Sequence, residues 1–589
     1  MQQLSIRINK HAVWLLAGIL LLAAALRFWG LDTGLPNMSR PDEQNISRPV
    51  VQTVLQSFFN GHPSLNPEFF IYPSLYMYML TLAYGVYYLL GHLAGSFNNG
   101  ADFIRLYLDN WYSFHLISRS ISALMGVATV WTMYQLGLAF FRNRLQALLC
   151  ALLLALTYLH IRDSHFGVTD VPGTLWVTLS LWLSVVYYRT QQQKHLYYAL
   201  VMAGLAASTK YPAGLVALAP LSAWWQFKKA SGLTPLDCLN RPSLLKECLK
   251  LAGVLFGVFL LASPYILLDF QRFLADFLSQ SNTMKQTHYL DLGRAWFHHP
   301  KFSFWYGLGS LYFLSGLAGI VLALRGKAKS LHAVLLIYAV VYYVLIGNTY
   351  VTFARYIIPV IPVLTLYSVL CAGFLASRVR RQNPRLFLSK NALMILIIAL
   401  FAVQPLWLSL QFNKVAAAPD TRTLARAWLL ENIHPEEAVG VGMSLSHIEM
   451  PTAYKKVYLA PIENPPPPGT RFRSFVPAEK ARFAPKPNNL RNEFNITTYG
   501  DTDALKQLGI RYVAIGVTPL TLYTTPDFEV EKLENPEKFK RVATFLPFTK
   551  KMTEIDPVIF DQLDGLYIPF SDFTGVTAPG PEIRIYEVL

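Results

Sequence analysis

Residues 40–45 read Arg40-Pro41-Asp42-Glu43-Gln44-Asn45, and they follow shortly after the first long apolar segment of the chain. Two adjacent carboxylates therefore lie where the chain has just left a membrane. Acidic side chains at a bilayer are costly unless they are solvated, paired or bound to a ligand. We expect the rest of the chain to build a lipid-facing pocket around this pair.

The composition is that of a membrane protein. Of 589 residues, 53% are hydrophobic and only 15% are charged, whereas soluble domains carry about 25% charged residues. The net charge of +16 does not indicate nucleic acid as a partner, because the basic residues form short clusters between apolar runs, as orientation signals do. Two of the four cysteines lie in apolar runs and two in one basic loop, so a disulfide framework is not expected.

Apolar runs of spanning length define the predicted helices. They occur at 12–30, 113–140, 145–160, 171–188, 249–268, 303–324, 331–347, 355–377 and 392–412. The first follows Arg7 and Lys10 as a signal peptide would, but no close cleavage site follows it, so we expect a retained helix. Residues 196–227 are too long for one helix and are interrupted at Ser208 to Pro212.

Basic clusters mark the cytoplasmic ends of membrane helices. They are Arg7/Lys10, Arg142/Arg144, Arg189/Lys194, Lys228/Lys229 with Lys246/Lys250, Arg325/Lys327/Lys329 and Arg378/Arg380/Arg381/Arg385/Lys390. If all lie inside, 196–227 must form two short helices with Lys210 at their outer turn, and 72–91 must stay on the outer face. The prediction is an α-helical polytopic protein of the cell membrane with about eleven transmembrane helices, outer-face juxtamembrane helices, a cytoplasmic N-terminus and an outer C-terminus.

The composition changes after residue 412. Helical spacing at 420–432, short strands at 438–441 and 512–515, an irregular Pro-rich segment at 461–488 and a turn into a strand at 579–586 predict a small α/β domain. We therefore expect a transmembrane catalytic domain over 1–412, with a first outer loop at 31–112, and an extracytoplasmic α/β domain over 413–589.

The acidic pair has two interpretations. Asp42 could cap a helix over Gln44 to Phe58, which is the simpler explanation for the pair taken alone. In the functional interpretation, Asp42 is a general base that takes a proton from an acceptor hydroxyl, and Glu43 positions the acceptor or holds a metal.

The charge sorting places further ionisable residues on the same, outer side. Asp163, His165 and Asp170 lie within eight residues and are catalytic or ligand-binding candidates or simply interfacial groups. Arg119, Lys210 and Arg355 are cations at the depth of a lipid phosphate, which they could bind unless they only reach for headgroups. The adjacent Tyr211 and Tyr356 could donate hydrogen bonds or belong to an interfacial aromatic belt. No Walker loop is present, so ATP is not favoured as a driving force.

An ordered set of motifs resembles the GT-C type membrane glycosyltransferases, within them the protein O-mannosyltransferase and aminoarabinose-transferase group. The resemblance covers roughly residues 10–412. Its motifs are Arg40-Pro41-Asp42-Glu43, Phe69-Phe70-Ile71-Tyr72-Pro73-Ser74-Leu75-Tyr76, Ser118-Arg119, Arg162-Asp163-Ser164-His165 through Asp170-Val171-Pro172, Ala207-Ser208-Thr209-Lys210-Tyr211, and Phe353-Ala354-Arg355-Tyr356 with Pro359.

The resemblance implies an inverting transfer of a sugar from a polyprenyl-phosphate donor to a hydroxyl of a lipid, glycan or protein on the outer face. It implies Asp42 as the base with Glu43 in support, and Arg119 and Arg355 on the lipid phosphate. Tyr72 is a further substrate-binding candidate by its place in the motif.

One departure concerns a metal. Aminoarabinose transferases carry a Glu-Lys pair before the proline that matches Pro73, and Ile71-Tyr72 stands there in this chain. A lipid A acceptor is therefore not implied. A divalent metal ion is the only cofactor under consideration, with Glu43, Glu68 and His165 as candidate ligands.

Two other classes of function remain open. The same charges could line the pathway of a transporter or flippase for a lipid-linked or anionic substrate, although transporters place charges near the midplane and usually have repeated halves. The chain could also be a membrane scaffold whose C-terminal domain binds a partner.

Overall fold

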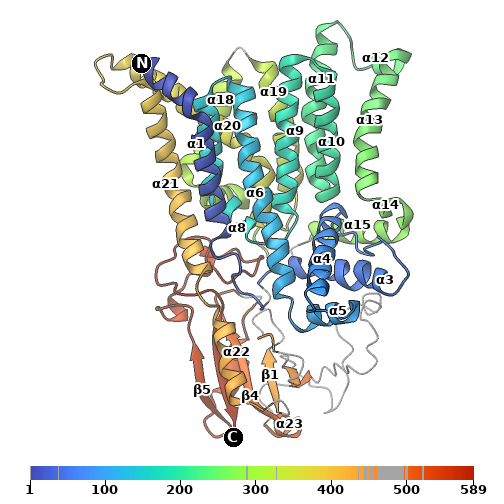
Figure 1. Ribbon diagram of the computed structural model, residues 1–589. Helices are drawn as coiled ribbons and strands as arrows, with labels where there is room; N and C mark the ends of the chain where they lie inside the picture. Colours follow the sequence, from blue (N-terminus) through green and yellow to red (C-terminus); the bar gives the residue numbers. More distant parts are fainter. Residues whose placement is uncertain are drawn as a thin grey trace. The chain divides into compact units, whose positions relative to one another are not determined.

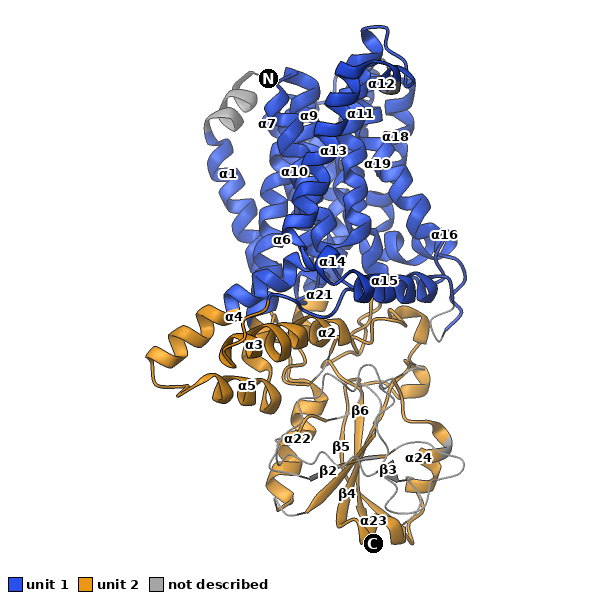
Figure 2. Cartoon of the chain, turned by 90° about the vertical axis from the view of Figure 1, so that its right-hand side faces the viewer, with its two compact units in different colours: residues 1–29, 65–83, 117–411 blue, residues 30–64, 84–116, 412–589 orange. Residues whose placement is uncertain are grey.

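The structure is a computed structural model. It describes residues 2–37, 39–286, 290–326, 328–434, 437–442, 448–450, 455–459, 496–497, 502–520 and 523–589. The chain forms two compact units, and Figure 2 shows them in different colours. Unit 1 comprises residues 1–29, 65–83 and 117–411, and unit 2 comprises 30–64, 84–116 and 412–589. Parts of the predicted first outer loop are thus grouped with the C-terminal residues.

Unit 1 is a bundle of helices, in which α9, α10, α11 and α13 run side by side (Figure 1). Its longer helices are α1 (Gln2–Phe28), α6 (Tyr112–Phe141), α7 (Arg144–Ala155), α9 (Asp170–Thr190), α10 (Gln193–Thr209), α11 (Leu218–Ala230), α13 (Pro242–Ala262), α15 (Phe270–Met284), α18 (Ser310–Arg325), α19 (Lys329–Gly347), α20 (Ile361–Gln382) and α21 (Lys390–Ala416). Each predicted apolar run therefore contributes to a helix.

The chain is a multi-pass membrane protein. Within the described ranges, six helices are long and apolar enough to cross a membrane, or up to eight if each of two bent pairs is one span. One bent pair joins α7 to α8 (Tyr158–Ser164) at 57°, and the other joins residues 295–307 to α18 at 117°. The count of about eleven crossings is not confirmed. Helix α4 (Leu75–Leu93) is not among the six, and its location on the outer face stays a prediction.

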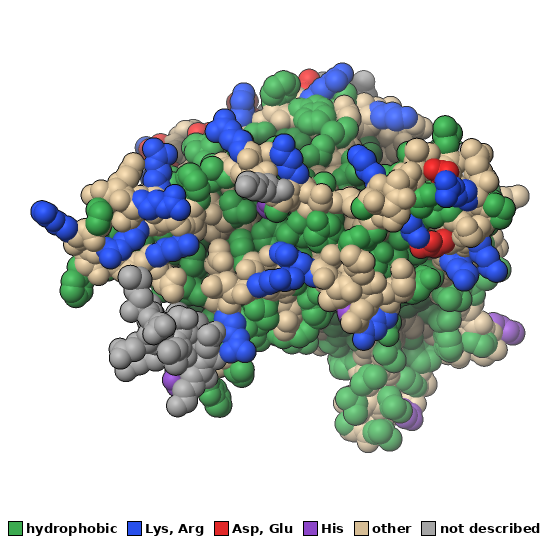
Figure 3. All heavy atoms as spheres, turned by 90° about the horizontal axis from the view of Figure 1, so that it is seen from above, with side chains coloured by type: hydrophobic (Ala, Val, Ile, Leu, Met, Phe, Trp, Pro, Cys, Tyr) green, Lys and Arg blue, Asp and Glu red, His purple; other side chains and the backbone are tan. Residues whose placement is uncertain are grey.

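Lys and Arg side chains gather at one end of the helix bundle. Figure 3 shows this end, on which basic side chains far outnumber acidic ones. An excess of positive charge at this end agrees with the predicted sorting of basic clusters. The assignment of this end to the cytoplasm stays a prediction.

Lys210 precedes, and Arg355 lies in, a short 3-10 helix that contains a proline. Helix α10 ends at Thr209, Lys210 is extended with φ −152° and ψ 119°, and the 3-10 helix η2 (Tyr211–Ala217) carries Pro212 in its first turn. Proline lacks an N–H and disfavours helical geometry in the residue before it, so the helix is interrupted here. The predicted break at Lys210 is confirmed. Arg355 likewise lies in a 3-10 helix, η4 (Ala354–Val360), which contains Pro359.

In unit 2, a continuous helical segment follows Arg40. It consists of α2 (Pro41–Pro49), η1 (Val50–Leu55) and α3 (Gln56–Phe59). Arg40 is the N-cap residue and Asp42 lies inside the first turn, so the interpretation of Asp42 as the helix cap is wrong. Proline suits the first helical position because its missing N–H would have no partner there, which moves the start of the helix to Pro41. Helix α5 (Gly100–Asp109) packs against η1 and α3.

The C-terminal residues form a three-layer α/β arrangement. The sheet has the order β3-β2-β1-β4-β6-β5, in which β3, β2, β1 and β4 are parallel and β6 pairs antiparallel with both β4 and β5. The strands are β1 (Ala438–Gly442), β2 (Lys455–Leu459), β3 (Ile496–Thr497), β4 (Ile510–Val517), β5 (Phe539–Phe545) and β6 (Glu582–Val588). The expected α/β domain is confirmed, while the Pro-rich segment 461–488 lies outside the described residues.

Alternation along the strands separates two apolar layers. Helix α22 (Thr421–Asn432) covers one face through Ala425 and Leu429, which pack with Val439 and Val441 (Figure 1). The other face is covered by α23 (Thr502–Gln507) and α24 (Asp527–Leu533), whose leucines pack with the strand residues of the opposite parity.

The contact between α18 and α20 provides a test of the bundle. A Cβ added at Gly319 would lie 1.9 Å from the carbonyl oxygen of Tyr367, and a backbone atom cannot move away without separating the helices. We expect Gly319→Ala to destabilise the protein by about 1–3 kcal/mol, measured by thermal unfolding in detergent. Gly257→Ala is the matched control, because nothing lies within 4 Å of its added Cβ, and it should be neutral or slightly stabilising. Equal effects would contradict the close packing.

Candidate functional site

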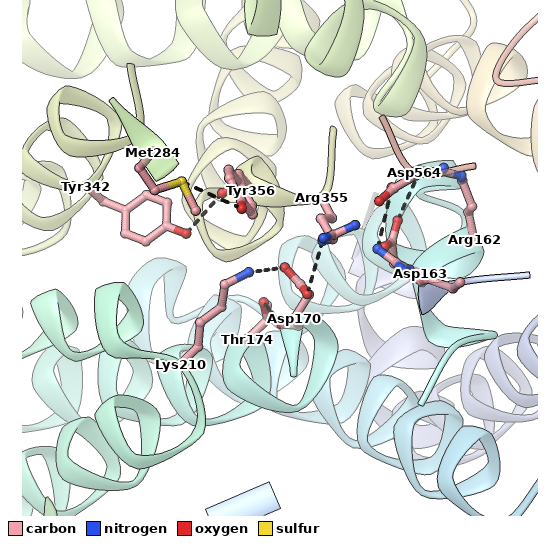
Figure 4. Close-up of polar contacts among 11 residues, drawn as sticks. Arg162, Asp163, Asp170, Thr174, Lys210, Met284, Tyr342, Arg355, Tyr356 and Asp564 are labelled. Carbon is pink, nitrogen blue, oxygen red and sulfur yellow. Dashed lines mark hydrogen bonds and ion pairs between the residues drawn. The ribbon is translucent and has the colours of Figure 1, made fainter. Parts of the chain in front are cut away.

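A buried carboxylate shared by two cations is the centre of the candidate site in unit 1. Asp170 begins α9, and its Oδ1 forms an ion pair with Lys210 Nζ (Figure 4). Its Oδ2 lies 3.7 Å from Arg355 Nε. The exposed fractions are 2% for Asp170, 9% for Lys210 and 3% for Arg355. Three segments that are distant in the sequence are therefore joined by one carboxylate.

Aromatic rings surround the two cations. Lys210 Nζ lies 4.7 Å from the ring centroid of Tyr356, and Arg355 Cζ lies 3.9 Å from that of Phe353. The Tyr342 hydroxyl donates a hydrogen bond of 3.0 Å to the carbonyl oxygen of Tyr356. The electron-rich faces of aromatic rings attract cations, so these contacts help to hold both cations in place.

The charges of this cluster suit an anionic ligand. Asp170 carries one negative charge and Lys210 and Arg355 carry two positive charges, so the three side chains together have a net charge of +1. Arg and Lys are the side chains that bind phosphate through charge-assisted hydrogen bonds. A phosphate of a lipid is an anion of the appropriate kind.

The tyrosines predicted to bind substrate have separate contacts. The Tyr211 hydroxyl donates a hydrogen bond of 2.9 Å to the carbonyl oxygen of Phe70. The ring of Tyr72 lies 6.2 Å from that of Phe69. The same segment is held by α15, because the Phe70 N–H donates to Asp276 Oδ2 over 2.8 Å. These contacts fix residues 69–72 within unit 1.

Arg119, Asp163 and His165 are all buried. The guanidinium carbon of Arg119 lies 5.3 Å from the ring centroid of Phe166. Asp163 Oδ2 lies 3.4 Å from Arg162 Nη1. His165 directs Nδ1 at the carbonyl oxygen of Ile161 (2.9 Å) and Nε2 at that of Trp29 (3.0 Å).

The candidate metal ligands do not fit a metal site. No group of three or more His, Cys, Asp or Glu side chains suited to a metal is found among the residues that the structure describes. Both ring nitrogens of His165 face carbonyl oxygens, whereas a ligating nitrogen needs its lone pair for the metal. Glu68 Oε2 lies 3.0 Å from Arg272 Nη1. No reaction step is therefore assigned to a metal.

The acidic pair lies in unit 2, in the first turn of α2. Asp42 is partly exposed, whereas Glu43 is buried with an exposed fraction of 2%. The N-terminus of a helix favours negative charge. Behind the pair, Ser47 Oγ lies 2.8 Å from the Tyr107 hydroxyl and 3.2 Å from His115 Nε2. Burial raises the pKa of Tyr107 to about 12, so its hydroxyl is neutral. The contacts of Ser47 with Tyr107 and His115 hold α2 against these two residues.

The structure thus brings some of the predicted residues together. Asp170, Lys210 and Arg355 meet in unit 1, whereas Asp42 and Glu43 belong to unit 2, so the predicted convergence of all of them stays a prediction. The contacts of Tyr342 and Phe353 in this cluster were not predicted. Phe353 was part of a motif, but Tyr342 lies in an apolar helix where an aromatic residue carries no distinguishing signal.

Comparison with known proteins places this cluster in a family context. Residues 115–231 match the family model of dolichyl-phosphate-mannose-protein mannosyltransferases. The match includes Asp170 and Lys210 and agrees with the predicted resemblance. An uncharacterized protein of Aquifex aeolicus (strain VF5) is 35% identical over 98 residues, which are 17% of this chain and 20% of that protein. The aligned part thus spans about a fifth of that relative.

Solved structures of glycosyltransferases show weaker likenesses. The oligosaccharyltransferase of Archaeoglobus fulgidus has a TM-score of 0.48 at 13% identity, with 98% of this chain and 88% of that chain covered. ArnT of Cupriavidus metallidurans bound to undecaprenyl phosphate has a TM-score of 0.48 at 14% identity, with 90% and 96% covered. The Pmt1-Pmt2 complex of S. cerevisiae bound to its sugar donor has a TM-score of 0.33 at 19% identity, with 44% and 34% covered.

The shared carboxylate makes a testable demand on stability. Asp170→Asn leaves Lys210 and Arg355 buried together without their common counter-charge, and removal of one partner from a buried ion pair costs about 3–5 kcal/mol. We expect a loss of this order in unfolding experiments on the purified protein. Glu68→Gln is the control, because its ion pair with Arg272 is about one-third exposed and should contribute at most about 1 kcal/mol. Similar losses for the two variants would contradict the role of Asp170.

Proposed function

We propose that the chain is a glycosyltransferase that takes a sugar from a polyprenyl-phosphate donor. The carrying observation is the buried cluster of Asp170, Lys210 and Arg355, two of whose members lie in the segment that matches a family named for a dolichyl-phosphate-mannose donor. A donor of this kind has a lipid tail, which suits a membrane protein, and a phosphate, which suits a cluster of net positive charge.

In the proposed reaction, an acceptor hydroxyl attacks the anomeric carbon of the sugar with inversion. Asp42 accepts the hydroxyl proton as the bond to the sugar forms. The bond between the anomeric carbon and the phosphate oxygen breaks, and its electron pair leaves with the lipid phosphate. Lys210 and Arg355 stabilise the negative charge that develops there. Asp170 orients both cations, and Glu43 supports Asp42.

The remaining candidates have secondary roles in this scheme. Arg119 is a third cation for the phosphate, and Asp163 is a further acid of unit 1. Tyr72, Tyr211 and Tyr356 line the approach of the substrate. The reaction takes place on the outer face, with residues 413–589 outside the cell membrane. The acceptor is a hydroxyl of a lipid, a glycan or a protein.

Arg355 provides a direct test of the phosphate site. Arg355→Gln removes one cation but leaves Asp170 paired with Lys210, so the fold should be retained. We expect the affinity for undecaprenyl phosphate, measured on the full chain in nanodiscs, to fall about tenfold or more, since hydrogen bonds to charged groups contribute about 1.5–3 kcal/mol. Arg355→Lys should have an intermediate affinity because it keeps the charge without the planar fork.

Two comparisons make this result specific. Arg272→Gln removes a cation of the same unit that is about one-third exposed, and it should leave the affinity unchanged. Undecaprenol, which lacks the phosphate, should bind equally to all variants. An unchanged affinity of Arg355→Gln for undecaprenyl phosphate would exclude the assignment.

Asp42 tests the chemistry separately. Cells whose only copy of the protein carries Asp42→Asn should show the same changes in lipid-linked sugars and glycans, by mass spectrometry, as cells that lack the protein, because an amide cannot accept the proton. Asp109→Asn changes an exposed carboxylate of the same unit and should leave the profile normal. A normal profile for Asp42→Asn would reject Asp42 as the base. Changed membrane sidedness of a lipid-linked sugar without loss of any glycosidic bond would favour the flippase.

A further inference from the structure

The turn that precedes the acidic pair is held by residues from the C-terminal part of unit 2. Arg40 is the N-cap residue of α2, and its main-chain carbonyl accepts the Glu43 N–H over 3.2 Å. Its side chain reaches Asp564, with Nη2 3.5 Å from Oδ2, and both side chains are fully buried. A single residue therefore links the first turn of α2 to a carboxylate more than 500 positions later in the chain.

A second buried ion pair supports the same turn. Arg422 donates from Nε to Asp420 Oδ1 (2.9 Å) and from Nη2 to Asp420 Oδ2 (2.8 Å). The same Nη2 lies 3.3 Å from Ser39 Oγ. Burial opposes the charge of Arg422, but Asp420 outweighs this effect, so the pKa of Arg422 is raised. The arginine is therefore a permanent cation whose position is fixed by a two-point contact.

Gly34 and Asn37 also have close contacts in this region of unit 2. A Cβ added at Gly34, where φ is +73°, would lie 1.8 Å from Ser39 Oγ, so only glycine fits there. The Asn37 side chain is fully buried. It donates to Thr423 Oγ1 over 3.0 Å and accepts from the Glu449 N–H over 3.1 Å. Residues 34–40 thus have several specific contacts to residues after 412.

We infer that Asp564 and the Asp420–Arg422 pair are positioning residues for Asp42 and Glu43. Residues 412–589 then act as a scaffold for the catalytic turn, in addition to any part they have in acceptor binding. This inference rests on the proposed role of Asp42 as the base. It follows from the buried contact between Asp564 and Arg40, because Arg40 is the N-cap residue of α2 and therefore fixes where the helix starts.

Buried ion pairs are suited to such a role. A well-packed apolar pair of the same volume often gives equal or greater stability, but a charged pair requires a defined geometry. A general base must be held within hydrogen-bonding reach of the proton that it takes. Positioning by Asp564 therefore affects where Asp42 lies more than whether unit 2 folds.

Hydrogen exchange on the full-length protein in detergent tests the inference without a known substrate. In Asp564→Asn, the amides of residues 43–55 should exchange about tenfold faster than in the wild type, because the lost pair lowers the free energy of local opening. Exchange in β4 should be unchanged, which shows that the sheet remains folded. Asp572→Asn, an exposed carboxylate of the same region, should leave residues 43–55 unchanged.

Rescue distinguishes positioning from general damage. Arg40→Gln alone leaves Asp564 as a buried charge, whereas Arg40→Gln with Asp564→Asn removes both charges. The double variant should recover part of the protection of residues 43–55 that each single variant loses. Additive losses, or unchanged exchange in Asp564→Asn, would overturn the inference.

The cellular glycan profile completes the test. Asp564→Asn should reproduce the defect of Asp42→Asn in weaker form. If exchange increases and Asp564→Asn transfers sugar normally while Asp42→Asn does not, the positioning role is rejected. If Asp42→Asn is also normal, the proposed function of Asp42 fails, and the exchange result alone still shows that Asp564 holds α2.

Discussion

The pairing of one buried carboxylate with two buried cations is the interaction on which unit 1 depends. Asp170 is the first residue of α9, Lys210 lies where Pro212 interrupts a helical segment, and Arg355 lies in the 3-10 helix that precedes α20. Ionisable groups are expensive inside a bilayer protein, and they are found where they pair or serve a substrate. In unit 1 the three ionisable groups pair with one another. Their net charge of +1 would also allow them to bind an anionic substrate.

Unit 2 also contains buried ion pairs, and there they help to connect segments that are distant in the sequence. The buried Arg40–Asp564 pair joins a residue before 41 to a residue after 412. Arg422, which is paired with Asp420, makes a second such link because its Nη2 lies 3.3 Å from Ser39 Oγ. These contacts explain why segments of the first outer loop and the C-terminal residues form one compact unit. A boundary at residue 412, drawn from composition alone, describes where apolar runs end but not which segments pack together.

The sequence predicted the elements of the fold much better than their contacts. Apolar runs located the long helices, and Pro212 located the break beside Lys210, because both signals are local. The strands β2, β3 and β5 were not predicted: β3 has only two residues, and β2 and β5 each begin with charged or mixed residues rather than a clear apolar alternation. One of the two interpretations made Asp42 the cap of a helix over Gln44 to Phe58, because an acidic N-cap is common, whereas Pro41 occupies the first turn and Arg40 precedes it.

The candidate site shows the same difference. Sorting by Lys and Arg placed Asp170, Lys210 and Arg355 on one side of the membrane, but a side is not a contact. The number of membrane crossings between basic clusters does not show that Asp170 is shared by Lys210 and Arg355. Nor does it show that Arg119 lies over the ring of Phe166. Which side chains pair depends on the rotation of each helix about its axis. That rotation is set by packing against neighbouring helices and cannot be predicted from the sequence of one helix alone.

A comparison with Arg27, another buried cation of unit 1, shows what is particular about the shared carboxylate. Arg27 of α1 is fully buried, and its Nη1 donates to the carbonyl oxygens of Ala23 (3.1 Å) and Ala155 (3.3 Å). Its Nη2 lies 2.9 Å from His160 Nδ1. Because arginine can only donate, Nδ1 must accept, and the proton of a neutral His160 is on Nε2.

The two arrangements have different consequences for a ligand. Around Arg27, neutral acceptors from α1 and from the α7–α8 region surround both Nη atoms, and these hydrogen bonds join the segments. Around Asp170, a charged acceptor is divided between two cations, so each cation retains attraction for a further anion. A phosphate that approached Lys210 and Arg355 would add a second negative charge to a cluster that has two positive ones, and the sum would be near neutrality. The division of one carboxylate between two cations is therefore the feature that makes this part of unit 1 suitable for a lipid phosphate, whereas the surroundings of Arg27 are suited to holding helices together.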